Sequence, residues 1–276
     1  MAPETPIRVA FLVSRQGPSE IASLAASAGW SIVEADRLSP RAAVTECDVL
    51  VTLLDGDEMV RALLLDANSV ASNVRPGQVL VDVSPISAQL MVEVAGQWAA
   101  LGARAFGTSV RATRNGLRAY VDSDLLESTR ATTAIRAIAR EVCATGVIGS
   151  SKAMATIEGL LEAVTAAASA EAIALGAQAG IPARILVPLL LKGSGGNEAL
   201  RMHAREDTRG TLACVRADLA RAEALSRRCG HPALFGALAT VACRGAIAAS
   251  GEDESPYVAM LQWFQARRRV APRAAA

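Results

Sequence analysis

The chain has 276 residues, of which 51% are hydrophobic, and a net charge of +1 at pH 7. This length allows two domains, and the interspersed acids and bases argue against a nucleic-acid-binding surface. Aromatic residues make up only 3%, which favours helices that pack through small side chains. We therefore expect a globular protein with no nucleic acid among its partners.

The cysteines and histidines indicate neither disulfides nor a metal site. The five cysteines form no C-x-x-C pair and the two histidines lie in separate segments, so we expect reduced thiols, a cytoplasmic location and no bound metal. We also expect no targeting signal before Ile7. The apolar residues 159–180 include Glu162 and Glu171, which favours a buried helix over a membrane span.

The first half of the chain alternates apolar strands with amphipathic helices. We predict strands at residues 9–13, 30–35, 48–54, 78–83, 103–108, 117–121 and 141–148, and helical segments at residues 21–28, 40–46, 87–101 and 129–140. Repeated β-α-β units with short links predict a mostly parallel sheet covered on both faces. Residues 1–149 therefore read as a Rossmann-like, doubly wound α/β domain.

The second half, residues 150–276, shows helical spacing and no convincing strand. Apolar residues recur at helical spacing from 152 to 179, and Gly180 and Pro182 end that helix. Shorter helices are expected at residues 183–191, 211–229, 232–250 and 256–268. We predict an all-α domain joined to the first by the long helix. The apolar stripe of this helix is wider than one small domain can cover, which predicts a homodimer.

Three stretches carry a resemblance to a known family. They are VRPGQVLVDVSPIS, the long-helix segment VIGSSKAMATIEGLLEAVTAAASAEAIALGAQAGI, and KGSGGNEAL. From residue 7 to about residue 264 the chain resembles the β-hydroxyacid dehydrogenases, which include 3-hydroxyisobutyrate dehydrogenase, tartronate semialdehyde reductase and proteins like 6-phosphogluconate dehydrogenase. The resemblance implies a dinucleotide on the first β–α turn and a lysine on the long helix as general acid/base. It also implies an asparagine one turn later and a substrate-binding S-G-G loop.

The dinucleotide turn departs from the family pattern. The positions of its three glycines fall on Val13, Arg15 and Pro18, and Arg15 obstructs the close backbone approach that a pyrophosphate needs. One interpretation keeps a phosphate site, with Arg15 pairing a phosphate between Ser14 and Gln16. The interpretation we favour is that Ser14 and Ser19 only cap a helix.

Three further residues are candidates for contact with the cofactor. Asp36 and Arg37 stand where the resemblance places the adenine ribose, and Ser84 stands near the nicotinamide. Without a phosphate-binding turn, Asp36 and Arg37 simply begin a loop.

The positions of the catalytic pair are also substituted. The lysine position falls on Ala155 and the asparagine position on Gly159. Lys152 lies three residues before Ala155, about 60° around the helix, so we expect it to be a solvated lysine near the helix start. Glu158 is either a base or a polar residue at the domain boundary.

The substrate loop appears at residues 108–115, where the chain is several residues short of the family pattern. Ser109 stands near the family's serine, and Arg111 either binds a small acidic ligand or is solvated in a surface loop. Gly193 and Ser194 retain the glycine-serine turn on the opposite side of the implied site.

These losses favour a protein with the dehydrogenase fold that lacks ordinary hydride transfer. It would be a non-catalytic relative, a ligand-binding protein or a subunit that supports an active paralogous partner. The alternative is a divergent NAD(P)-dependent oxidoreductase that acts on a small hydroxy acid or a related carbonyl or imine substrate. It would use Lys152, Glu158 or Tyr120. We expect NAD or NADP to bind only under this alternative.

Overall fold

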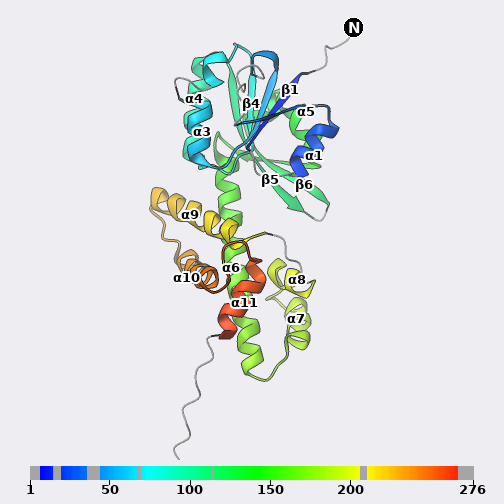
Figure 1. Cartoon of the computed structure of the whole chain (residues 1–276), viewed down its shortest axis with the longest axis vertical. Helices are drawn as coiled ribbons and strands as arrows, with labels where there is room; N and C mark the ends of the chain where they lie inside the picture. Colours follow the sequence, from blue (N-terminus) through cyan, green and yellow to red (C-terminus); the bar gives the residue numbers. More distant parts are fainter. Residues whose placement is uncertain are drawn as a thin grey trace, which may run out of the picture. The chain divides into compact units, whose positions relative to one another are not determined.

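The computed structural model describes residues 7–14, 20–35, 44–66, 70–113, 115–205 and 210–266. The chain divides into two compact units, Met1–Ala155 and Thr156–Ala276 (Figure 1). The units part within helix α6 (Ser150–Gln178), whereas the expected border between residues 149 and 150 coincides with the start of that helix. That border stays a prediction, and each unit is treated below by itself.

Within the described residues, the first unit contains a seven-stranded sheet of order β2-β1-β3-β4-β5-β6-β7. The strands are β1 (Val9–Val13), β2 (Ser31–Glu34), β3 (Val49–Leu53), β4 (Val79–Asp82), β5 (Arg104–Thr113), β6 (Gly116–Asp122) and β7 (Glu141–Gly146). Every neighbouring pair is parallel except β5 and β6. The predicted doubly wound α/β fold is confirmed.

Helices cover both faces of this sheet because successive strand residues point to opposite sides. The helical elements are α1 (Glu20–Ser27), α3 (Asp57–Leu64), η1 (Val70–Asn73), α4 (Ala88–Ala100), η2 (Ser123–Glu127) and α5 (Thr129–Ile138). Leu12 and Leu80 pack with Trp98 of α4 in one core, and Phe11 and Val81 pack with Ile135 of α5 in the other. Because these strands are buried on both faces, their sequences are continuous apolar runs.

The segment expected to be a shortened loop is instead a β-hairpin. β5 continues to Thr113 and pairs antiparallel with β6 from Thr108↔Val121 to Thr113↔Gly116. The turn contains Asn115 and Gly116, and Gly116 has φ 109°, a conformation that glycine adopts readily. The loop expectation for residues 108–115 is wrong because this part of the chain finds cross-strand partners.

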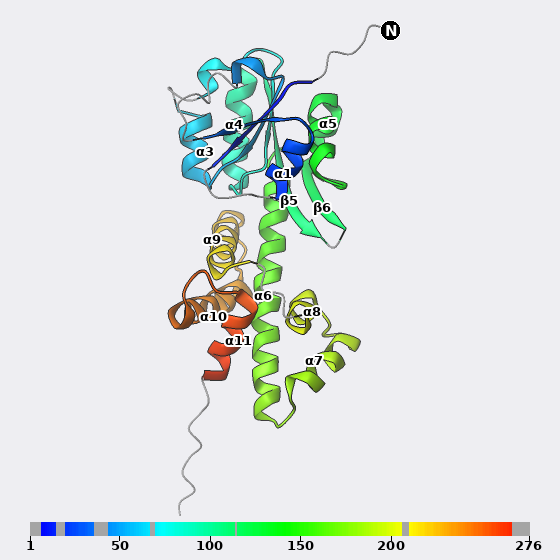
Figure 2. The same cartoon turned by 45° about the vertical axis from the view of Figure 1, so that its right-hand side comes forward.

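The described residues of the second unit form helices only. After α6 come α7 (Ala183–Lys192), α8 (Glu198–Ala204), α9 (Leu212–Cys229), α10 (Leu234–Ser250) and α11 (Pro256–Ala266) (Figure 2). Ala163 and Ala166 of α6 pack with Leu219, Cys243 and Met260, as expected for a core of small side chains. Among the described helices, α6 alone is long and apolar enough to cross a membrane by length and composition, and 44% of its most apolar window is buried inside the protein.

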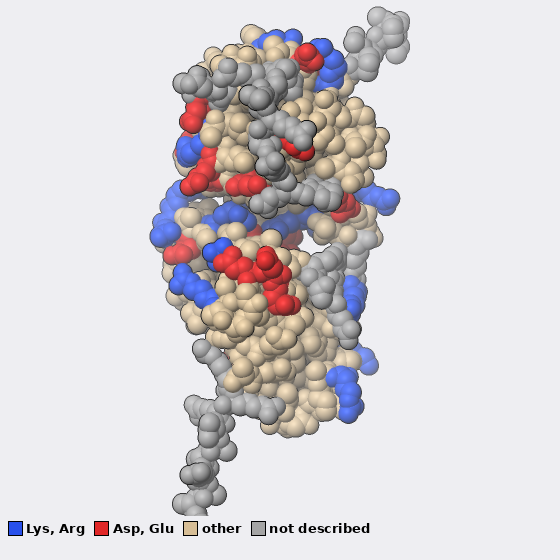
Figure 3. All heavy atoms as spheres, viewed as in Figure 1, with Lys and Arg blue, Asp and Glu red and all other residues tan. Residues whose placement is uncertain are grey.

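The second unit also exposes large apolar side chains. Charged side chains of both signs are visible on the surface of both units (Figure 3). Leu161 on α6 is 63% exposed, and Phe235 and Leu238 on α10 are 72% and 66% exposed. Apolar faces of this kind mark protein interaction surfaces.

We propose that these faces form a two-fold homodimer in which α6 packs against the partner's second unit. Light scattering at micromolar concentration should give about twice the 28.6 kDa chain mass. Leu161→Glu should weaken the dimer because it buries a charge at the interface. Val147→Glu, at a 79% exposed position of the first unit, is the control. A monodisperse monomer at high concentration would contradict the proposal.

Candidate functional site

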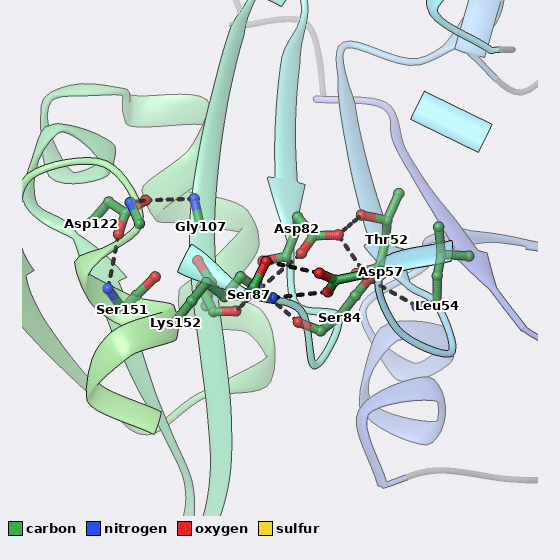
Figure 4. Close-up of polar contacts among 12 residues, drawn as sticks. Thr52, Leu54, Asp57, Asp82, Ser84, Ser87, Gly107, Asp122, Ser151 and Lys152 are labelled. Atoms are coloured by element: carbon green, nitrogen blue, oxygen red, sulfur yellow. Dashed lines mark hydrogen bonds and ion pairs between the residues drawn. The ribbon is translucent and has the colours of Figure 1, made fainter. Parts of the chain in front are cut away.

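Buried polar side chains gather at the carboxyl ends of the central strands in the first unit (Figure 4). Thr52 lies near the end of β3, Asp82 ends β4, and Ser84 follows it. In doubly wound sheets, ligands bind at this edge. The candidate site is therefore built from these strand ends and from the first turns of α6.

Lys152 is the central side chain of this group. Its Nζ donates to the backbone oxygens of Asp82, Ser84 and Thr108 at 2.9, 2.8 and 2.8 Å. Nζ also lies 2.8 Å from Asp82 Oδ1, and the two side chains are 1% and 0% exposed. The expectation of a solvated lysine is wrong. Helical side chains point toward the helix N-terminus, and here that direction leads to the end of β4 and to Thr108 within β5.

The second oxygen of Asp82 completes the network. Asp82 Oδ2 accepts hydrogen bonds from Thr52 Oγ1 and Ser84 Oγ, each at 2.7 Å. Ser84 Oγ accepts in turn from the amide of Leu54 at 2.9 Å. We expected Ser84 to lie near a nicotinamide, but its hydroxyl is hydrogen-bonded to other groups of the protein. The carboxylate of Asp82 is stabilised by one ammonium and two hydroxyls.

A second buried carboxylate, Asp122, holds the start of α6. Its Oδ2 accepts from the amides of Gly107 and Gly149 at 2.8 and 3.0 Å, and its Oδ1 accepts from the amide of Ser151 at 3.0 Å. A carboxylate is favourable at a helix N-terminus. A Cβ at Gly107 would lie 2.7 Å from Asp122 Oδ2, so only glycine allows this approach.

The sequence did not lead us to expect Asp82 and Asp122 to be buried, hydrogen-bonded carboxylates. The available signal was an acidic residue within an apolar run, in VLVDVS for Asp82 and in AYVDSD for Asp122. Such an acid needs buried partners.

The hairpin brings Arg111 to α6. Arg111 Nη2 donates to the backbone oxygen of Ala155 at 2.8 Å, and Ser109 lies buried in β5 opposite Tyr120. Arg111 is therefore partly buried, and the expectation of a solvated arginine in a surface loop is wrong. The structure brings together the two places where the resemblance implies the substrate loop and the lysine.

Glu158 and Gly159 belong to the second unit. A Cβ at Gly159 would lie 2.8 Å from Cγ of Asp218, and Asp218 Oδ1 is paired with Arg221 Nη2 at 2.6 Å. An asparagine at position 159 would therefore have to displace this ion pair. Glu158 is half-buried, and Gly193 and Ser194 are exposed beyond the end of α7.

The dinucleotide turn is described only at its first residue. The amide of Ser14 donates to the oxygen of Leu53 at 3.0 Å, so it continues the pairing of β1 with β3 and is not available to a phosphate. Arg15, Gln16, Ser19, Asp36 and Arg37 lie outside the described residues. No group of His, Cys, Asp and Glu among the described residues could hold a metal ion.

Lys152→Met should lower the free energy of unfolding by about 3–5 kcal/mol, because it leaves the Asp82 carboxylate buried without its ammonium. Adding Asp82→Asn should recover part of that loss, because no buried charge then lacks a counter-charge. Chemical denaturation measures both effects. Arg61→Met breaks an exposed pair with Glu93 and should change stability little. Equal losses of unfolding free energy in Lys152→Met and Arg61→Met would contradict the assignment of Lys152 to a buried ion pair with Asp82.

Two protein-family models match the chain. The NAD binding domain of 6-phosphogluconate dehydrogenase matches residues 14–121. The NAD-binding model of NADP-dependent 3-hydroxyisobutyrate dehydrogenase matches residues 149–264.

Individual relatives agree with these matches. The chain is 28% identical over 170 residues to the NAD-dependent L-serine dehydrogenase of Pseudomonas aeruginosa, covering 60% of this chain and 57% of that protein. It is 26% identical over 161 residues to 3-hydroxyisobutyrate dehydrogenase of the same organism, covering 56% of this chain and 54% of that protein. These alignments therefore span little more than half of each relative.

Solved structures share the fold over nearly the whole chain. A Mycobacterium tuberculosis 3-hydroxyisobutyrate dehydrogenase with L-serine superposes with a TM-score of 0.81 at 22% identity, covering 94% of this chain and 99% of that one. An imine reductase from Bacillus cereus gives a TM-score of 0.58 at 16% identity, covering 94% and 99%. The two family models, which together match residues 14–121 and 149–264, show that the chain belongs to the β-hydroxyacid dehydrogenase family.

Proposed function

We propose that this chain keeps the β-hydroxyacid dehydrogenase fold without the family's lysine-assisted hydride transfer. In this proposal it is a non-catalytic relative that binds a ligand or supports an active paralogous subunit. The observation that carries the proposal is the burial of Lys152 in its ion pair with Asp82.

The number and positions of the lysines support the proposed absence of lysine-assisted hydride transfer. The chain has two lysines, Lys152 and Lys192. The three ammonium protons of Lys152 face three backbone oxygens and one carboxylate oxygen, so this group is not placed to exchange a proton with a substrate. Lys192 ends α7 in the other unit, and Ala155 stands at the position implied for the catalytic lysine. A general acid/base contributes about 10²–10⁴-fold in rate.

The first β–α turn also lacks the features that a dinucleotide needs. NAD(P) is the cofactor of the family, and its pyrophosphate needs helix N-terminal amides and a close backbone approach. In this chain Val13, Arg15 and Pro18 replace the three glycines of the turn. The backbone amide of Ser14 is already bonded to Leu53.

The alternative is a divergent NAD(P)-dependent oxidoreductase for a small hydroxy acid or a related carbonyl or imine. The names of the relatives favour it, since these are dehydrogenases and an imine reductase. Its proton donor would be Glu158 or Tyr120, because Lys152 is committed to the ion pair with Asp82.

The unaltered chain should bind neither NADH nor NADPH saturably at sub-millimolar concentration in calorimetry. It should also show no turnover of 3-hydroxyisobutyrate, glycerate, threonate or a cyclic imine. Micromolar binding of NADPH would contradict the cofactor part of the proposal. Turnover that disappears in Glu158→Gln or Tyr120→Phe would establish the alternative.

A gain-of-function series sharpens the test. Val13→Gly, Arg15→Gly and Pro18→Gly should be needed for cofactor binding, and Ala155→Lys for proton transfer. Gly159→Asn should be tolerated only with Asp218→Ala, which removes the carboxyl group that an added Cβ would meet at 2.8 Å and leaves the Cβ of residue 218 at 3.0 Å. Ala153→Lys, on the same helix, is the matched control for Ala155→Lys. Activity in the glycine series without Ala155→Lys would contradict the stated role of position 155.

A further inference from the structure

Helices α9 and α10 of the second unit lie side by side (Figures 1 and 2). Between them is a groove with a volume of about 380 Å³, which is at the small end of the range for ligand pockets. Its lining residues are Arg216, Leu219, Ala220 and Glu223 on α9, Thr240, Cys243, Arg244, Ile247 and Ala248 on α10, and Glu252 just after α10. Helix residues three and four apart share a face, so the groove is formed by one face of each helix.

The floor of this groove is apolar. Leu219 and Cys243 are 4% and 1% exposed and belong to the core of the second unit. The Cys243 thiol donates to the backbone oxygen of Leu212 at 3.8 Å. Burial raises the pKa of this thiol, so it stays neutral at pH 7 and acts as a small apolar group. Ala220 and Ala248 contribute only methyl groups to the lining, which leaves room for the apolar part of a ligand.

One positive charge at the groove has no counter-charge. Arg216 Nη2 lies 2.9 Å from Glu252 Oε2, and Glu223 Oε1 lies 3.7 Å from Arg227 Nη1, so these four groups form two ion pairs. Within the part of the chain that the structure describes, no carboxylate lies within ion-pair distance of Arg244. A single anionic group placed at Arg244 would balance this charge.

We propose that the groove binds a small monocarboxylate, with the carboxylate on Arg244 and the apolar part over Leu219 and Cys243. A guanidinium binds a carboxylate through two parallel N–H donors. One unpaired cation matches a carboxylate better than a phosphate group, which carries about 1.5–2 negative charges at pH 7.

This inference goes beyond the proposed function. All residues that line the groove belong to the second unit, and none of them takes part in the network around Lys152. Neither a dinucleotide nor turnover is involved, so the ligand test succeeds or fails separately from the tests of the dehydrogenase site.

The groove is also distinct from the apolar face of α10 that we assign to the homodimer. The exposed side chains Phe235 and Leu238 of that face do not line the groove. Six residues separate Leu238 from Arg244, which places them about 120° apart around the helix. Ligand binding in the groove therefore does not depend on that face.

The test is calorimetric titration of the full chain with hexanoate at constant ionic strength. We expect saturable binding with a dissociation constant below about 1 mM. Affinity should rise about fourfold per methylene from butyrate to hexanoate, because each methylene removes apolar surface from water. Hexanol, which has the same chain without the charge, should bind at least tenfold more weakly. No saturable binding of hexanoate, or equal binding of hexanol, would overturn the proposal.

Variants locate the site. Arg244→Gln should weaken hexanoate binding at least tenfold, as expected for loss of a charged hydrogen bond. Arg184→Gln, at an exposed position of α7 in the same unit, should bind hexanoate like the parent. Ala220→Trp should abolish binding because the indole fills the groove, and Ala248→Phe fills it from the other helix if Ala220→Trp does not fold. Unchanged hexanoate affinity in Arg244→Gln or in a folded groove-filling variant would overturn the assignment of the site.

Discussion

The ion pair between Lys152 and Asp82 organises the carboxyl edge of the sheet. Each charge would cost several kcal/mol if buried alone, so each depends on the other and on the hydrogen bonds of Thr52 and Ser84. The same ammonium binds the carbonyl of Asp82 at the end of β4, that of Ser84 just after it, and that of Thr108 within β5. The edge at which doubly wound proteins bind ligands is therefore built around a lysine that stabilises the fold.

Asp122 extends this arrangement to the backbone of α6. It bonds the amides of Gly149 and Ser151, so the helix start is held by Asp122 while Lys152 reaches from its first turn to Asp82. The direction of α6 in the first unit then places Ala155 beside Arg111 of the hairpin. The family scaffold is kept, but an arginine and an alanine occupy the places implied for the substrate loop and the lysine.

Much of this fold could be predicted from the sequence because its signals are local. Continuous apolar runs marked the buried strands, and glycine and proline marked the end of the long helix. The hairpin could not be predicted from the family's longer substrate loop. The strand pairing of residues 108–115 depends on their register with β6, which the local sequence does not show. The burial of Lys152 was missed because helical spacing assigns a residue to a face of a helix but does not locate the end of β4 or the middle of β5. Asp82, an acid within an apolar run, was the local signal that a buried partner was needed.

The central claim is that Lys152 is a structural group withdrawn from solvent, and the chain's two lysines make it directly measurable. The native protein would be treated with an amine-acylating reagent. Peptide mass spectrometry would then measure how much Lys152 and the exposed Lys192 have been modified. Lys152 should stay unmodified while Lys192 reacts, and both should react after unfolding in denaturant. Modification of Lys152 in the folded protein as fast as Lys192 would contradict the account.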